Sequence, residues 1–389
     1  MEKLNKSIYV TRPNLPPLEK IQPYLEAIWQ NKILTNEGPF HQKFEKELAN
    51  YLQVEHVNLF TNGTLALVVG LQALRITGEV ITTPFSFVAT THALKWNGIT
   101  PVFCDIKEKN LNIDPDKIES LISPKTTAIM PVHIYGHMCD TEKIQSIADK
   151  YGLKIIYDAA HAFGVKVNYK NLLLEGDLSV LSFHGTKLFN TFEGGAIITK
   201  DTKLKERIDF LKNFGIADEL TVIAPGINGK MNEFQSVVGL LSLEIVNKEI
   251  ANRKRVAEIY FDLLRNIKGI RVFETFDNYD YNYAYFPILI DEEKFGVSRE
   301  KIYNELRKNG IFARRYFYPL ISNLPSYRSL PSAAKEYLPI ANKVADQILC
   351  LPIYGELETC MIETIVEIII SCSNIINEPK LFPLSLQHK

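Results

Sequence analysis

Three short segments of the sequence carry residue types that could together bind an anion and activate an amine. The first is Asn62-Gly63-Thr64, which follows the apolar stretch 57–60 and opens an apolar helix. The first N–H groups of a helix have no partner within the helix, so a small turn at that place can hold a phosphate monoester. Asn-Gly before a helix is also a common turn with a cap, and the motif by itself leaves both interpretations open.

An acid follows a second apolar run. Asp158 lies within the segment Ile155–His161, directly after the residues Ile155-Ile156-Tyr157. Ligands of open α/β sheets collect at the carboxyl ends of the strands, and the two alanines after Asp158 leave room there. A carboxylate in such a place needs a cationic partner to stay charged, and a protonated pyridine nitrogen would supply one. The alternative is that Asp158 is a helix cap or a salt-bridge partner.

A lysine completes the set. The segment Leu178–Lys187 is typical of a strand that runs into a polar turn, and Glu193-Gly194-Gly195 follows closely. A lysine that forms a Schiff base must lose its proton, which is easier near a strand end with few competing charges. A solvated surface position is the alternative for Lys187.

The elements that must position these residues are βα units. From about residue 64 to residue 199, helical periodicity alternates with short β-rich runs, a pattern that predicts a mostly parallel sheet. Predicted helices include 64–75 and 141–151. The predicted strands are 79–82, 101–105, 127–133, 154–157, 178–182 and 196–199.

The character of the sequence then changes. A long helix is predicted over about 233–267, followed by strands at 271–274 and 284–290, a helix near 299–309 and a final helix from about 358. This mixture predicts a smaller α+β domain packed against the large α/β domain. We place the division after residue 240, with residues 1–240, including an N-terminal arm, in the large domain and 241–389 in the small one.

Length and composition exclude several classes of protein. At 389 residues, with 46% hydrophobic and 23% charged residues, the chain is long enough for two or three packed units of an ordinary globular protein. The formal net charge of -1 gives no reason to expect nucleic acid or an anionic membrane as a partner. The beginning of the chain has no apolar signal core, and the five scattered cysteines form no CxxC pair, so we expect a cytoplasmic protein without a metal site.

Together these segments resemble the DegT/DnrJ/EryC1/StrS family of sugar aminotransferases, which depend on pyridoxal 5'-phosphate (PLP). The resemblance spans essentially the whole chain, and its specificity lies in the order and spacing of the motifs. These motifs are Asn62–Thr64, Thr83–Thr90, Asp158–Gly164, Ser182–Lys187, Glu193–Gly195 and Gly226–Glu233. The resemblance implies the fold-type-I aminotransferase architecture and a homodimer whose active sites are shared between subunits.

The resemblance also implies roles for individual residues. Lys187 would link covalently to PLP and later move a proton, and Asp158 would pair with the pyridine nitrogen. Phe87 would stack on the cofactor ring, with core packing as its alternative, and His161 would lie beside the cofactor. The cofactor phosphate would be held by Gly63, Thr64 and Ser182, and by Asn228 of the other subunit.

The expected substrates rest on the same resemblance. Many relatives carry His-Tyr-x-Pro where this chain has Tyr316-Phe317-Tyr318-Pro319, preceded by Arg314 and Arg315. Either arginine could bind a nucleotide diphosphate or the carboxylates of L-glutamate, or be a surface charge. His184 and Tyr316 are further candidates for contact with the substrate.

The run 33–40 and the loop 183–186 resemble most the branch that aminates C-4 of a dTDP-linked 4-keto-6-deoxyhexose for bacterial surface polysaccharides, such as the O-antigen of lipopolysaccharide. The alternatives are a C-3 aminotransferase of a dTDP-3-keto-6-deoxyhexose and a non-catalytic ligand-binding module of the same fold. A sugar 3-dehydratase, in which histidine replaces the lysine, is disfavoured by Lys187.

Overall fold

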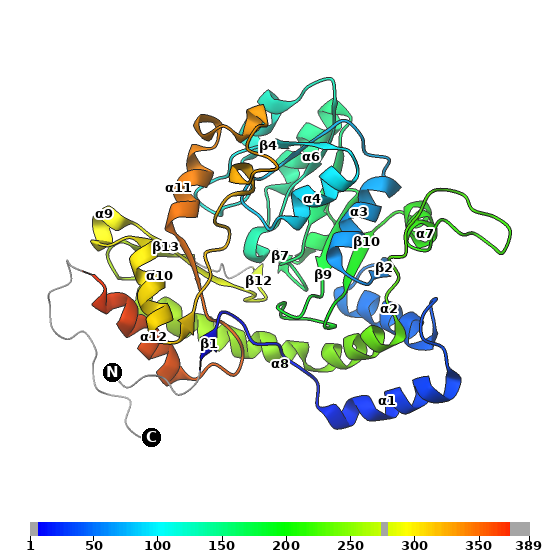
Figure 1. The fold of residues 1–389 in the computed structure, drawn as a ribbon, viewed down its shortest axis with the longest axis horizontal. Helices are drawn as coiled ribbons and strands as arrows, with labels where there is room; N and C mark the ends of the chain where they lie inside the picture. The colour runs from blue at the N-terminus through cyan, green and yellow to red at the C-terminus, as the bar shows by residue number, and fades with distance from the viewer. Residues whose placement is uncertain (1–6, 274–278, 374–389) are drawn as a thin grey trace.

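A computed structural model describes residues 7–273 and 279–373 (Figure 1). A large α/β part holds the main sheet, and a smaller α+β part lies beside it. The long helix α8 (Glu233–Leu264) runs along the base of both parts in this view. The predicted division after residue 240 falls inside this helix, and the two-domain assignment stays a prediction.

The main sheet has seven strands and is mostly parallel, as predicted. In spatial order the strands are β2 (His56–Phe60), β10 (Gly195–Thr199), β9 (Leu178–Ser182), β6 (Lys154–Asp158), β5 (Thr126–Met130), β3 (Glu79–Thr82) and β4 (Thr100–Phe103). Neighbouring strands from β9 to β4 run parallel, and β10 is antiparallel to both of its neighbours, β9 and β2. The six predicted strands are present within a few residues of their predicted ends, and β2 is the strand that the prediction left out.

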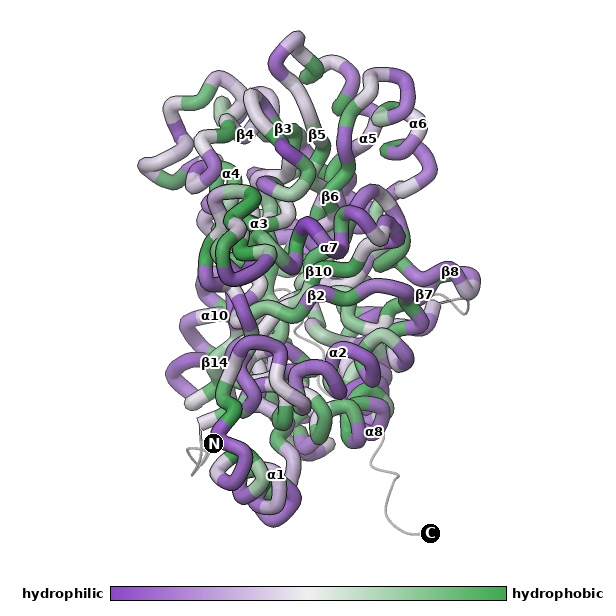
Figure 2. The backbone as a smooth tube through the Cα atoms, turned by 90° about the vertical axis from the view of Figure 1, so that its right-hand side faces the viewer, coloured by the Kyte–Doolittle hydropathy of each residue, from purple (hydrophilic) through white to green (hydrophobic). Residues whose placement is uncertain are grey.

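Helices cover the faces of this sheet because one or more of their faces are apolar. Helix α3 (Gly63–Ala73) is apolar nearly all round and lies buried against β9 and β10. Figure 2 shows this contrast: the central strands and α3 are hydrophobic, while α6 (Thr141–Tyr151) and α1 (Leu18–Asn31) present hydrophilic residues at the outside. The other helical segments of the large part are α1 (Leu18–Asn31), α2 (Pro39–Leu52), α4 (Ala89–Trp96), α5 (Pro115–Ile118), η1 (Glu119–Leu121), η2 (Ile134–Gly136), α6 (Thr141–Tyr151), η3 (Leu172–Leu174) and α7 (Thr202–Leu211).

The small part is built on an antiparallel sheet of β11 (Ile270–Val272), β13 (Phe286–Ile290) and β15 (Ile348–Leu351). The strand predicted at 271–274 is present at 270–272, and residue 274 lies outside the described residues. The helical segments here are α9 (Glu292–Phe295), α10 (Arg299–Lys308), η4 (Ile321–Asn323), η5 (Pro331–Ala333), η6 (Lys335–Tyr337), α11 (Pro339–Gln347) and α12 (Thr359–Ser371).

Short strands tie distant segments together. The N-terminal β1 (Ile8–Tyr9) pairs in parallel with β14 (Ile311–Phe312), so the beginning of the described chain packs against the small part. A second small sheet joins β7 (Lys166–Val167), β8 (Lys170–Asn171) and β12 (Tyr279–Asp280). None of the helices in the described ranges combines the length and the apolar character needed to cross a membrane.

Candidate active site

A cavity of about 360 Å³ lies at the edge where β6 and β9 end, and it collects residues from both parts of the molecule. Its size falls within the usual range for a small-molecule site. The start of α3 supplies Gly63, the end of β6 supplies Asp158 and the loop after β9 supplies Lys187, while the small part supplies Tyr285 and Arg314. The parallel arrangement brings the strand ends together, as expected for ligand sites in open α/β sheets.

One end of the cavity is formed by the start of α3. The Asn62 side chain caps this helix by accepting a hydrogen bond from the Leu65 N–H at 2.8 Å. Gly63 and Thr64, whose N–H groups have no partner within the helix, line the cavity together with Ser182. A Cβ on Gly195 would lie 2.6 Å from the Gly63 nitrogen, so the two glycines allow this turn to pack directly on β10. The result is a polar cradle of the kind that binds a phosphate group.

Asp158 is buried at the other side of the cavity, as the last residue of β6. Thr90 Oγ1 donates to Asp158 Oδ2 at 2.8 Å, and the Ala160 N–H donates to Oδ1 at 3.1 Å. Burial raises the pKa of the Asp158 carboxyl, while Thr90, Ala160 and the charge of Lys187 oppose that shift. A cation placed beside this carboxylate would offset its loss of hydration.

Lys187 lies in the loop after β9 and lines the same cavity. Loss of hydration lowers the pKa of its amine to about 8, against the opposing effects of Asp158 and Tyr316. The Nζ atom donates a hydrogen bond to the Tyr285 hydroxyl at 3.2 Å. A substantial fraction of neutral amine is therefore present near pH 8, which nucleophilic attack and proton uptake both require.

His161 and Phe87 occupy two further walls. His161 is buried, its Nδ1 accepts a hydrogen bond from the Tyr135 N–H at 3.1 Å, and burial lowers the pKa of the ring well below its ordinary value. The ring is therefore neutral, with its proton on Nε2. Phe87 lines the cavity with 58% of its surface exposed, so its ring is outside the core and is free to stack on a ligand.

The candidate substrate residues separate into two groups. His184, Tyr316 and Arg314 line the cavity, and His184 Nδ1 lies 2.8 Å from Thr186 Oγ1. Arg315 lies elsewhere: its Nη1 donates to both carboxylate oxygens of Glu300 at 2.9 and 2.8 Å, and its guanidinium sits 4.2 Å from the Tyr303 ring centre. The structure thus brings Arg314, but not Arg315, to the predicted site.

Asn228 is not among the described residues that line the cavity of its own chain. It is exposed and pairs with Asn213 in an isolated β-bridge, at the point where the segment after α7 returns to the body of the molecule and Lys230 pairs with Phe60. The arrangement leaves Asn228 accessible to another molecule.

Sequence reasoning missed two neighbours of the predicted residues. Thr90 belongs to the motif 83–90, but nothing in the sequence indicates that its hydroxyl meets Asp158. Tyr285 is the last of four alternating tyrosines, at 279, 281, 283 and 285, and the alternation is typical of a strand without indicating which ring faces the lysine.

The parallel sheet, the helix-start phosphate cradle and the acid and lysine at neighbouring strand ends together define a PLP-dependent aminotransferase. The sequence comparison specifies the family: residues 18–370 match the model of the DegT/DnrJ/EryC1/StrS aminotransferase family, to which this chain belongs. The predicted family, fold class and cofactor dependence are thereby confirmed.

Individual relatives agree with this assignment. The chain is 54% identical over 369 residues to a dTDP-4-amino-4,6-dideoxy-D-glucose transaminase of Escherichia coli, covering 94% of this chain and 99% of that protein. It is 50% identical to a protein of the same name from Shigella dysenteriae, with 94% and 99% covered. The crystal structure of DesI with its TDP-sugar product superimposes with a TM-score of 0.91 at 34% identity, covering 95% of this chain and 94% of DesI.

The residues present fit PLP. The start of α3 and Ser182 offer donors to a phosphate, the buried Asp158 offers a carboxylate to a protonated ring nitrogen, and Lys187 lines the same cavity. The glycine packing at Gly63 and Gly195 keeps the phosphate cradle open, because a Cβ on Gly63 would itself meet Ser182 Cβ at 3.1 Å.

Proposed function

We propose that this protein transfers an amino group from L-glutamate to C-4 of dTDP-4-keto-6-deoxy-D-glucose, giving dTDP-4-amino-4,6-dideoxy-D-glucose and 2-oxoglutarate. The observation that carries the proposal is the 54% identity, over nearly the full length of both chains, to the E. coli transaminase of that name. The polar and aromatic cavity at the strand ends supports it. Use of the product for surface polysaccharide and a cytoplasmic location stay predictions from the sequence.

The proposed chemistry assigns the proton transfers to Lys187. When bound, PLP supplies an electron-withdrawing ring that accepts the electron pair left as a C–H bond next to nitrogen breaks. Lys187 Nζ, with its pKa lowered to about 8, takes up that proton and returns it at the neighbouring carbon. The same movement in reverse serves the keto sugar, so one amine handles both half-reactions.

The surrounding residues would orient the cofactor and the substrates and hold them in place. Asp158, fixed by Thr90 and by the Ala160 N–H, keeps a negative charge where the ring nitrogen is to be protonated. With PLP bound, Gly63, Thr64 and Ser182 would hold its phosphate, Phe87 would cover one face of its ring, and His161 would donate a hydrogen bond to it from Nε2. Arg314 lines the cavity with an exposed side chain, which suits the carboxylate of the amino donor or the diphosphate of the sugar nucleotide.

The proposal includes a homodimer in which Asn228 completes the phosphate site of the other subunit. Two features support it. The projecting segment after α7 carries the exposed apolar side chains Leu220 and Val222, at 93% and 67% exposure. The stacked rings of Phe192 and Phe234, with centroids 5.6 Å apart, are also partly exposed. Apolar patches of this kind are typical of surfaces that contact another chain.

The test is a comparison of two keto sugars. Purified protein with PLP and L-glutamate is incubated with dTDP-4-keto-6-deoxy-D-glucose or with its 3-keto isomer, 2-oxoglutarate is measured, and the new C–N bond is located by NMR. Amination of the 4-keto sugar is expected, with the 3-keto isomer at least roughly a hundredfold slower because the wrong carbon is misplaced by about 1 Å or more. Amination of the 3-keto isomer alone contradicts the C-4 assignment. Absence of both products and of a covalent PLP link contradicts an enzymatic role.

A further inference from the structure

Tyr285 reaches Lys187 from the other part of the molecule. The lysine follows β9 of the main sheet, whereas the tyrosine lies directly before β13 of the small part, 98 residues later in the chain. Lys187 Nζ and Tyr285 Oη are 3.2 Å apart, and Nζ lies 5.8 Å from the centre of the same ring. This is the hydrogen bond that the structure gives to the lysine side chain.

We propose that Tyr285 is a positioning residue whose hydroxyl holds the free amine of Lys187 in the direction required for attack on the cofactor and for proton transfer. This inference rests on the proposed function of the site, since it assigns a role in the same chemistry. Tyr285 acts through Lys187.

The ring of Tyr285 is held from several sides, so its hydroxyl has a defined place. It packs edge-on against His161 at 4.7 Å between ring centres and lies 5.4 Å from Tyr135. Tyr316 approaches it edge-on at 5.9 Å. A phenylalanine at this position keeps those ring contacts and removes only the hydroxyl.

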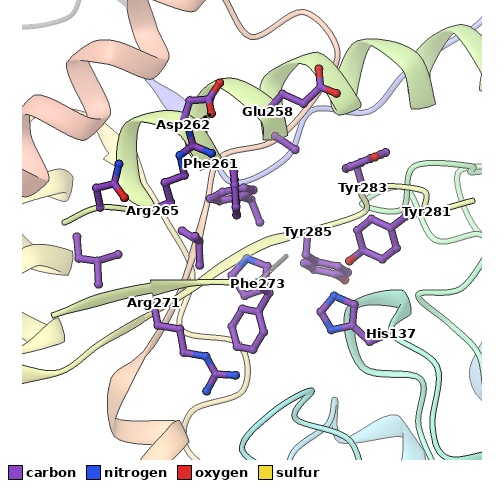
Figure 3. Close-up of a pocket in the computed structure, with 16 residues that line it drawn as sticks. His137, Glu258, Phe261, Asp262, Arg265, Arg271, Phe273, Tyr281, Tyr283 and Tyr285 are labelled. Carbon is purple, nitrogen blue, oxygen red and sulfur yellow. Dashed lines mark ion pairs between the residues drawn. The ribbon is translucent and has the colours of Figure 1, made fainter. Parts of the chain in front are cut away.

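A second cavity, of about 650 Å³, lies behind this ring (Figure 3). Tyr285 stands beside Tyr281 and His137 on one side of that cavity, opposite the end of α8 with Phe261 and Arg265. Tyr285 therefore forms a wall between the two cavities. A ring held in a wall can orient a hydroxyl without being covered by substrate.

The hydroxyl can serve both charge states of the lysine. Burial raises the pKa of Tyr285, so its proton stays in place over the working pH range. It accepts a hydrogen bond from a protonated amine and donates one to the lone pair of a neutral amine. Lys187 alternates between these states whenever it moves a proton, and the same partner is within reach in each.

Other titratable groups around Lys187 and Tyr285 affect the protonation of these two side chains. Asp158 and Tyr316 act on Lys187 and favour its protonated form, and the burial of His161 keeps that ring neutral. Cys350, Arg253 and Asp158 act on Tyr285. The Tyr285→Phe substitution leaves all five of these groups unchanged.

The test follows Lys187 without requiring turnover. Apoprotein is mixed with PLP across pH 6–10, and the rate of covalent link formation is followed by absorbance. For the wild type the rate is expected to rise with pH through a midpoint near the pKa of about 8. For Tyr285→Phe the plateau is expected to fall between roughly tenfold and a hundredfold, because the neutral amine loses its orientation. Its midpoint is expected to move down by about half a unit or more, because a hydrogen bond to a charged donor is stronger than one to a neutral donor.

Tyr281→Phe is the matched control. Tyr281 lies four residues before Tyr285 in the same segment of the chain. Its hydroxyl donates a hydrogen bond to the Tyr135 carbonyl at 2.6 Å and not to Lys187. We expect its rate profile to overlay that of the wild type. If the rate profile of Tyr285→Phe overlays those of the wild type and Tyr281→Phe, the proposal is overturned. It is also overturned if Tyr281→Phe loses as much rate as Tyr285→Phe.

A third variant tests whether the effect of Tyr285→Phe comes from the loss of the hydroxyl or from any substitution at this position. Tyr285→3-fluorotyrosine keeps a hydroxyl in place, and a link-formation rate within about twofold of wild type is expected for it. Equal losses in the fluorotyrosine and phenylalanine variants contradict a role for the hydroxyl. If the wild type itself forms no covalent link with PLP, the proposed function fails rather than the role of Tyr285, so the two failures are distinct.

Discussion

Thr90 Oγ1 donates a 2.8 Å hydrogen bond to Asp158 Oδ2, joining the second residue of α4 to the last residue of β6. Ser86 Oγ lies 2.9 Å from Thr90 Oγ1, and because Thr90 gives its proton to the carboxylate, Ser86 must donate to Thr90. All three side chains are buried. A chain of hydroxyls therefore orients the carboxylate that we assign to the ring nitrogen of the cofactor.

Removing the Thr90 hydroxyl is expected to slow turnover without unfolding the protein. Thr90→Val keeps the shape of the side chain but removes the hydrogen bond to the Asp158 carboxylate. A hydrogen bond to a charged group stabilises that group by roughly 1.5–3 kcal/mol. We expect kcat to fall about tenfold to a hundredfold. Thr91→Val is the control, because Thr91 is equally buried and its Oγ1 meets the Val88 carbonyl instead. Equal kcat values in the two variants would show that the Thr90 bond is only structural.

Asp158→Asn is expected to be more severe than Thr90→Val. The substitution removes the negative charge itself from a buried site, so the ring nitrogen loses the group that keeps it protonated. The loss is expected to be at least about 3 kcal/mol in the activation free energy, more than a hundredfold in kcat. Steady-state kinetics measure it, and circular dichroism checks the fold. Unchanged turnover would assign Asp158 a structural role.

Lys187→Ala is expected to abolish both turnover and the covalent link to PLP. Borohydride reduction of the wild type, followed by peptide mapping, should place the modified residue at Lys187. The exposed Lys95 offers a control, and Lys95→Ala should keep the link and the activity. Turnover of Lys187→Ala at a rate near that of the wild type would refute its assignment as the reactive amine.

The pKa of Lys187 also makes a prediction about stability and pH. The pKa is about 8 in the folded protein and about 10.5 in the unfolded chain, so the unfolded state binds more protons between these values. Below pH 8 the partly buried charge of Lys187 destabilises the apoprotein by no more than roughly 3 kcal/mol, and this cost fades as the pH rises toward 10.5. Lys187→Met should therefore exceed the apo wild type in stability at pH 7, with the difference shrinking at pH 9.5. Denaturant unfolding at both values measures it, and a difference that grows with pH would refute the shift.

The shared active site can be tested by mixing two inactive variants. Lys187→Ala subunits are combined with Asn228→Trp subunits, in which a bulky side chain blocks the phosphate site. If Asn228 acts in the other subunit, each heterodimer has one site with both lesions and one with none. Random mixing should then restore roughly a quarter of wild-type activity. Verified heterodimers without activity would place Asn228 and Lys187 in the same site of one chain.

The sequence by itself determined six of the seven strands of the main sheet, the family, and the positions of Asp158 and Lys187 after predicted strands. The strands depend on a short-range pattern, in which β-rich runs alternate with helical periods, and the family depends on the order and spacing of motifs along the chain. Asp158 and Lys187 each follow a predicted strand, and the structure brings them to one cavity because these strands, β6 and β9, are neighbours.

Only the tertiary structure decided which residues of the small part reach that edge. Arg314 and Arg315 are adjacent in sequence and alike in chemistry, yet one lines the cavity and the other pairs with Glu300. Tyr285 is one of four alternating tyrosines, and its contact with Lys187 depends on how β13 packs beside the main sheet. The contact of Tyr285 with Lys187 joins residues 98 positions apart. Its geometry is set by the packing of whole elements and leaves no local pattern in the sequence.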